Sequence, residues 1–181
     1  MDILVVLEDN RGSLHRMSKE AIAGAQKMGG SISALAIGSN ADALARELSV
    51  VDITEVITIN HDLVSSYNAD GYSDVVSQVI KSESPKTIVA GHSYQTRDFM
   101  PRVSAKLDIP FIPDIISMDD GIVKQVLNAK LNALVTTSAD QVILSFQSAT
   151  FSEEAMVTGS CLTRSIEVNL DSSIVRSEAE D

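Results

Sequence analysis

The feature that most constrains the fold is an alternation, repeated through about residue 110, between short runs of β-branched residues and segments of helical period. Such alternation is typical of β-α-β units arranged around a parallel sheet. We predict strands in this part of the chain at residues 3–7, 32–37, 55–59 and 87–91. The first strand is apolar throughout, as expected for a strand covered on both faces, and is therefore expected to be central.

Segments with helical spacing separate these strands. Ser18 is expected to cap the first helix, which ends at Gly29, and residues 41–48 are expected to form the second. In the fourth helix, Pro101 falls in the first turn if Asp98 is the cap, and a missing N–H costs little there. The buried faces of the third and fourth helices are expected to carry Val75, Val76, Val79 and Ile80, and Phe99, Val103 and Leu107.

The last third of the chain has a different pattern. Strand-like segments are joined by short links that contain Asp119-Asp120-Gly121 and Ser138-Ala139-Asp140, too short for parallel crossovers. The fold class is therefore predicted to be a three-layer α/β/α domain with a mostly parallel sheet and an antiparallel extension. The domain is expected to span residues 1–155, with an acidic tail or linker at 156–181. The strand-like segments are residues 111–116, 122–127, 130–136 and 142–146.

Charge and length exclude several classes of protein. Acidic residues outnumber basic ones 25 to 14, the net charge is −11, and no dense Lys/Arg run is present. Binding to DNA, RNA or an anionic membrane is therefore not expected. No apolar stretch approaches the roughly 20 residues that span a bilayer, and the start of the chain looks like a strand instead of a signal peptide, so a soluble cytoplasmic protein is expected. Cys161 is the single cysteine and His15, His61 and His92 lie far apart in sequence, which gives no support for a metal site.

The stretch Gly91-His92-Ser93-Tyr94-Gln95-Thr96-Arg97-Asp98 joins a predicted strand to a helix, where open parallel sheets usually bind ligands. His92 is interpreted as a loop histidine bonded to backbone, and Ser93 as a helix cap, because no nucleophile motif surrounds it. Arg97 and Arg102 suit an anion or a partner carboxylate, or salt bridges to Asp98 or Asp108. The pair Asp119-Asp120 is interpreted as a turn. No catalytic, cofactor-binding or metal-binding residue is assigned.

Three stretches of the chain, taken together, match the sequence pattern of a known protein family. The stretches Thr87 to Ser93, Arg97 to Leu107 and Pro113 to Ile116 resemble the α subunit of electron transfer flavoproteins. The family pattern there is an Ala-Gly strand end, a Gly-Arg/Lys-Asp/Asn-Leu-x-Pro-Arg-Val-Ala-Ala-Lys-Leu helix and a Ser/Thr-Asp strand. Asn128-Ala129-Lys130 and Gln147 depart from it, where the family has a glycine and commonly an arginine. The resemblance covers roughly residues 1 to 155.

The resemblance implies an electron carrier built from α and β subunits, which takes electrons from flavin dehydrogenases and passes them to a quinone reductase or similar acceptor. In that family FAD is held mainly by a second α domain, whose Ser-Gly-Gly-Arg-Gly, Gln-Thr-Gly and Gly-Ala-x-Gln-His motifs do not occur here. The chain therefore looks like the N-terminal domain alone, with the FAD-binding C-terminal domain absent. It is expected to be a non-catalytic scaffold that binds no cofactor by itself and uses residues 112–146 to pack against the β subunit.

Two other functions stay open. The first is an adenine-nucleotide-binding module of the universal-stress or nucleotide hydrolase-like fold, with its site near Leu7-Glu8-Asp9 and Gly91-His92-Ser93. The absence of Gly-x-x-x-x-Gly-Lys-Ser/Thr and Gly-x-Gly-x-x-Gly motifs counts against it. The second is a small enzyme that uses His92 and Ser93, for which the sequence offers no general base.

Overall fold

The computed structural model describes residues 1–174 and contains one large sheet. A two-stranded ribbon, β2 (Asp9–Asn10) and β3 (Ser13–Leu14), lies apart from it. From one edge to the other, the nine strands of the large sheet are β11 (Leu162–Ser165), β5 (Glu55–Ile59), β4 (Ile32–Ile37), β1 (Ile3–Val6), β6 (Thr87–Gly91), β10 (Val142–Phe146), β7 (Phe111–Ser117), β8 (Ile122–Val126) and β9 (Leu131–Val135).

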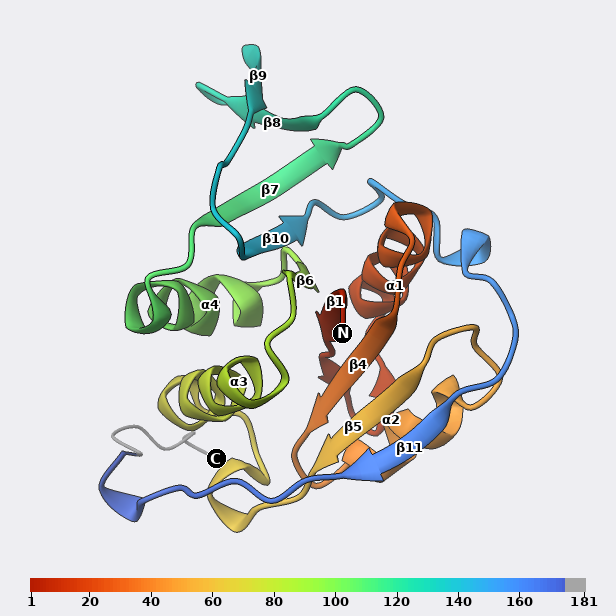
Figure 1. Ribbon diagram of the computed structural model, residues 1–181, viewed down its shortest axis with the longest axis vertical. Helices are drawn as coiled ribbons and strands as arrows, with labels where there is room; N and C mark the ends of the chain where they lie inside the picture. Colours follow the sequence, from red (N-terminus) through yellow and green to blue (C-terminus); the bar gives the residue numbers. More distant parts are fainter. Residues whose placement is uncertain (175–181) are drawn as a thin grey trace.

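Neighbouring strands are parallel from β11 through β7. Strand β8 is antiparallel to β7, and β9 is antiparallel to β8. The helices lie on the two faces of the sheet (Figure 1). Within residues 1–174 the α-helices are α1 (Arg16–Met28), α2 (Ala41–Leu48), α3 (Ala69–Glu83) and α4 (Tyr94–Leu107), and the short 3₁₀ turns are η1 (Asp62–Val64), η2 (Glu153–Ala155) and η3 (Ser172–Ile174).

Alternate residues of the central strand β1 face two separate apolar clusters. Ile3 and Val5 belong to the cluster that contains the buried residues of α1 and α2, whereas Leu4 and Val6 belong to the cluster with α3 and α4. This alternation follows from the two-residue period of a strand. The predicted three-layer α/β/α class is confirmed, as is the central place of the first strand.

The helix caps predicted at Ser18 and Asp98 are both wrong. Helix α1 begins earlier than expected, because His15 Nδ1 accepts from Met17 N, while the hydroxyl of Ser18 accepts instead from the backbone N–H of Glu8 at 2.8 Å. Helix α4 begins at a cap on Ser93, so Pro101 lies inside the helix. A proline there leaves the carbonyl four residues earlier without its helical donor.

The antiparallel extension is confirmed for β7, β8 and β9 but is wrong for β10. Strand β10 runs parallel to both of its neighbours, with Ile143 opposite Ile88 of β6 and Phe111 of β7. The links between single strands are indeed too short for a parallel crossover. The crossover is instead made by the whole of residues 118–141, which includes the β8–β9 hairpin that projects at the top of Figure 1.

Residues after Phe151 return across the molecule to the opposite edge of the sheet, where β11 pairs in parallel with β5 (Figure 1). A segment within the expected tail is therefore a sheet strand. The domain boundary at residue 155 stays a prediction. Most of the acidic stretch 171–181 lies outside the described residues.

Candidate functional site

A cavity with a volume of about 370 Å³ lies at the carboxyl ends of β1, β6 and β10. From β1 the chain proceeds to β4 on one side, and later places β6 on the other side, so the order of strands reverses between β1 and β6. Open α/β sheets bind ligands in the crevice at such a reversal. We call this cavity the switch-point cleft. It is lined by Glu8, His15, Met17, His92, Ser93, Tyr94, Arg97, Gln147 and Ser148.

His92 is fixed in place by two contacts with β10. Its backbone N–H donates to the carbonyl of Phe146 at 2.7 Å, and its Nδ1 lies 2.8 Å from the hydroxyl of Ser145. Burial lowers the pKa of His92, while Asp114 raises it and Arg97 and Lys124 lower it further. The imidazole is therefore mainly neutral at pH 7. The interpretation of His92 as a histidine bonded to backbone is wrong for the imidazole, which contacts the side chain of Ser145; only the backbone N–H of His92 bonds to a backbone carbonyl.

Asp114 lies near enough to His92 to raise its pKa, and strand β7 is irregular at Asp114. The register between β10 and β7 shifts after Leu144, and Asp114 has a φ of +61°, which is rare for a residue other than glycine. Its backbone N–H lies 3.4 Å from the hydroxyl of Ser145. The sequence reasoning did not connect Asp114 with His92. The proline at position 113 was the available signal, since proline inside a strand often marks a bulge.

Ser93 and His92 do not form a catalytic pair. The hydroxyl of Ser93 accepts from the backbone N–H of Thr96 at 3.1 Å, which confirms its role as a helix cap. The serine that contacts His92 is Ser145, which is completely buried and so cannot reach a substrate. The small-enzyme alternative therefore has no assembled nucleophile and base within residues 1–174.

Arg97 and Tyr94 form the outer wall of the cleft. Tyr94 is 88% exposed, and the guanidinium carbon of Arg97 lies 5.6 Å from the centre of its ring. Within the described chain no carboxylate lies within ion-pair distance of Arg97. The salt bridge predicted for this arginine as one alternative is therefore not formed, and its guanidinium is available.

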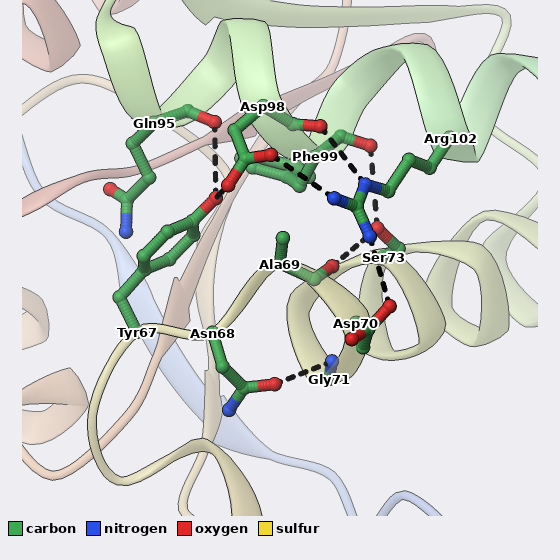
Figure 2. A network of polar contacts seen from close by, with 10 residues as sticks. All are labelled: Tyr67, Asn68, Ala69, Asp70, Gly71, Ser73, Gln95, Asp98, Phe99 and Arg102. Atoms are coloured by element: carbon green, nitrogen blue, oxygen red, sulfur yellow. Dashed lines mark hydrogen bonds and ion pairs between the residues drawn. The ribbon is translucent and has the colours of Figure 1, made fainter. Parts of the chain in front are cut away.

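Arg102 makes the salt bridge that the sequence suggested, and a second one. Its guanidinium donates to Asp98 at 3.3 Å and to Asp70 of α3 at 2.9 Å. Asp98 also accepts from the hydroxyl of Tyr67 at 2.8 Å, as Figure 2 shows. Asn68 caps α3 by accepting from the backbone N–H of Gly71. Asp98 and Arg102, which belong to the stretch that resembles the family, therefore hold helix α4 against helix α3 and do not line the switch-point cleft.

Gly91 is required for close packing. A Cβ at this position would lie 2.5 Å from the Cβ of Met17 and 2.9 Å from its carbonyl oxygen, so the start of α1 fills the space above the end of β6. A phosphate-binding turn needs that space for the approach of a pyrophosphate to the backbone.

Asp9, the other residue expected at a nucleotide site, already accepts from the N–H of Gly12 and from the side chain of Asn40. The nucleotide-binding alternative is therefore disfavoured.

The remaining candidates have structural roles. Asp119 and Asp120 form the expected turn between β7 and β8. Cys161 is partly buried with its sulfur 3.2 Å from the carbonyl of Leu48, and burial raises the pKa of the thiol. His61 caps η1, as His15 caps α1. Residues 1–174 hold no group of three or more His, Cys, Asp or Glu side chains suited to a metal ion.

These observations define a class: a doubly wound parallel α/β domain with an antiparallel extension, whose described residues form a switch-point cleft but no phosphate-binding loop. None of the described helices combines the length and apolar character needed to cross a bilayer. A sequence profile of the electron transfer flavoprotein domain matches residues 3–169. The chain belongs to this family.

Similar proteins carry related names. The electron transfer flavoprotein subunit alpha of Bacillus subtilis is 31% identical over 118 residues, which cover 64% of this chain and 36% of that subunit. The corresponding subunit of Thermoanaerobacterium thermosaccharolyticum is 27% identical over 122 residues, 65% of this chain and 37% of the subunit. The acryloyl-CoA reductase electron transfer subunit beta of Anaerotignum propionicum is 28% identical over 122 residues, 65% and 33% of the two chains. The chain spans about a third of the length of these curated relatives.

The family name implies a flavin, and the described residues do not fit one. A dinucleotide needs backbone N–H groups at an open glycine turn for its pyrophosphate. Here the turn after β6 is filled by Met17, and the N-terminus of α4 is capped by its own Ser93. No step of electron transfer is therefore assigned to residues of this chain.

Proposed function

We propose that this chain is the N-terminal, non-catalytic domain of an electron transfer flavoprotein α subunit, which pairs with a β subunit to form an FAD-dependent electron carrier. The observation that carries the proposal is the family match over residues 3–169, together with a fold whose described part lacks a flavin cradle. The domain is a carrier subunit and not an enzyme. FAD is held by parts of the complex outside these residues. Flavin dehydrogenases and a quinone reductase act on the complex and not on this domain. A cytoplasmic location stays a prediction from the sequence.

The β subunit binds at the edge formed by β9. This strand pairs with β8 on one side and with no other strand among the described residues on the other. A free strand edge presents unpaired N–H and C=O groups, which a soluble protein normally covers or protects. Leu131 and Leu134 of this strand are 56% and 65% exposed, and Leu127 in the adjacent turn is 68% exposed.

The arrangement of the leucines favours addition of a strand over packing of a flat surface. Successive residues of a strand point to opposite faces, so Leu131 and Leu134 lie on opposite faces of the hairpin. A surface laid against one face would leave the other leucine in water. A strand added to the edge satisfies the backbone groups and places partner side chains beside both leucines.

Co-purification tests the pairing. The 181-residue chain, carrying an affinity tag, is co-expressed with the β subunit from the same genome and then purified. We expect a complex with one copy of each subunit by light scattering. The chain expressed alone is expected to show no flavin absorbance. Recovery of the chain without the β subunit at micromolar concentrations of both, or stoichiometric flavin bound to the chain alone, contradicts the proposal.

A further inference from the structure

The switch-point cleft contains two charged groups that the proposed function does not use. Arg97 and Glu8 both line the cleft, and within residues 1–174 neither side chain has an ion-pair partner. Arg97 is exposed on the outer wall of the cleft and stays without a carboxylate partner in a chain with a net charge of −11. Arg102 and Arg164 are each bonded to two acids, whereas Arg11 and Arg46 are exposed and, like Arg97, form no ion pair within residues 1–174. Arg97 differs from Arg11 and Arg46 because it lines the cleft.

The cleft offers a further donor beside Arg97. Ser145 is completely buried, and no acceptor other than His92 Nδ1 is available to its hydroxyl proton among the described residues. Donation from Ser145 to Nδ1 leaves the proton of the neutral imidazole on Nε2. His92 then presents an N–H group on the side of the ring away from Ser145. A guanidinium and an imidazole N–H together suit an oxyanion.

Size and location agree with a small ligand. A volume of about 370 Å³ lies near the lower end of the range for small-molecule sites, which is about 300–1,000 Å³. The cleft lies at the strand reversal, where ligands of open parallel sheets bind. The filled space above Gly91 excludes a dinucleotide but leaves the outer cleft between Glu8 and Arg97.

We propose that the switch-point cleft binds a small molecule with an oxyanion, either carboxylate or phosphate, at one end and hydroxyl groups at the other. Arg97 and His92 contact the oxyanion, and the Glu8 carboxylate accepts from the hydroxyl groups. This binding does not require the β subunit or FAD, so its test is independent of the proposed function.

Calorimetric titration of the 181-residue chain at pH 7 tests the site. The probes are glycerol 3-phosphate, D-glycerate, inorganic phosphate, acetate and glycerol. Glycerol 3-phosphate or D-glycerate is expected to bind more tightly than inorganic phosphate or acetate, and glycerol is expected not to bind. Tighter binding of glycerol 3-phosphate than of D-glycerate identifies a phosphate site, and the reverse order identifies a carboxylate site. A Kd of about 1 mM is a weak affinity on the scale for small ligands. The proposal is overturned if none of the five probes binds when each is present at about ten times that concentration.

Two variants and one control assign the contacts. Arg97→Gln is expected to weaken binding of both oxyanion probes by about tenfold or more, the usual effect of losing a charge-assisted hydrogen bond. Glu8→Gln is expected to weaken the hydroxyl-bearing probes and to leave inorganic phosphate unchanged or tighter. Lys81→Gln changes the net charge as Arg97→Gln does, but Lys81 is exposed in the last turn of α3 and does not line the cleft. Equal loss in Lys81→Gln and Arg97→Gln indicates general charge attraction and overturns the proposal.

Discussion

The strands at the two edges of the sheet differ in their side-chain contacts. At one edge, β11 is held by Arg164, whose guanidinium donates to Glu55 of β5 at 2.9 and 3.0 Å and to Glu83 of α3 at 3.1 Å. Beyond β11, Gln78 and Asn169 exchange two hydrogen bonds. At the other edge, β9 carries two exposed leucines and, within residues 1–174, takes part in no ion pair. Both β11 and β9 have a strand neighbour on one side only.

We infer that the first edge, called here the clamped edge, is held by contacts within the chain, and that the second, the open edge, binds the proposed partner. Ion pairs and hydrogen bonds hold β11 to its own chain, and Leu162 is the one large apolar side chain that this strand exposes. An open edge with leucines on both faces gains from association. The open edge is therefore expected to respond to changes that affect binding, and the clamped edge to changes that affect folding.

The largest effect is expected from the double substitution Leu131→Lys and Leu134→Lys in β9. Two leucines that become buried on association contribute about 3 kcal/mol or more, so Kd for the β subunit is expected to rise roughly a hundredfold or more. The folding stability of the isolated chain is expected to change by less than about 0.5 kcal/mol, because both side chains are exposed. Titration calorimetry with purified β subunit measures the first effect, and urea unfolding the second.

Leu162→Lys is the matched control for this experiment. Leu162 lies in β11 at the other edge and is 73% exposed, more than either leucine of β9. Its substitution is expected to leave Kd for the β subunit unchanged. A similar loss of binding in both variants would show that the two edges are not distinguished by the partner.

Gly121→Ala is expected to loosen the open edge by about 1–3 kcal/mol, the usual cost of a strained backbone conformation. Gly121 has a φ of +114°, and an added Cβ would lie 2.8 Å from Cδ1 of Leu134. Hydrogen exchange of residues 122–135 is expected to accelerate, while exchange of β11 stays constant. Unchanged protection of the hairpin would mean that this turn does not hold β8 and β9 together.

Arg164→Met is expected to destabilise the chain by about 1 kcal/mol, because the ion pairs are partly exposed and are screened by solvent. Methionine keeps the apolar stem of the side chain and removes its charge. Urea unfolding measures the loss, and hydrogen exchange is expected to localise it to residues 162–166. Lys86→Met is the control, since its pair with Asp2 is highly exposed and its removal is expected to change stability less.

The smallest effect is expected in the pH dependence of the clamp. Hydrogen bonds from Arg164 lower the pKa of Glu55 below its ordinary value of 4.5. A carboxyl with a lowered pKa stabilises the folded state above its unfolded pKa, and this contribution is lost as the pH falls through the folded value. The stability difference between wild type and Arg164→Met is thus expected to shrink by less than about 1 kcal/mol between pH 6 and pH 3. A difference that is constant over this range would contradict the assigned partner.

The parallel half of the fold was predictable because each element is encoded locally. The strands at residues 32–37, 55–59 and 87–91 and the helix at 41–48 have the predicted bounds, since apolar runs there end at turn residues. The clamped edge was not predictable in this way. Leu162 to Ser165 has no apolar period, and its pairing depends on Arg164 meeting two acids that lie 109 and 81 residues away.

The position of β10 and the environment of His92 also required distant partners. An apolar run such as residues 142–146 predicts a strand but not its neighbours or direction, because those are decided by what the rest of the sheet leaves open. Likewise, His92 was recognised at a strand end, yet its partner Ser145 lies 53 residues away. The caps at Ser18 and Asp98 were wrong because short polar side chains suit several local hydrogen bonds, and Ser18 bonds to Glu8 instead.

The insertion of β10 between β6 and β7 has a consequence for how the chain can change. The β8–β9 hairpin lies in the chain between β7 and β10, which are neighbours in the sheet, so both ends of the hairpin connect to the parallel part of the sheet. The hairpin can vary in length and composition while the parallel strands keep the hydrogen bonds between them. In the proposed function, the residues that select the partner lie in the hairpin and the residues that form the core lie elsewhere in the chain, so exchange of the hairpin alone is the simplest route to a new assembly.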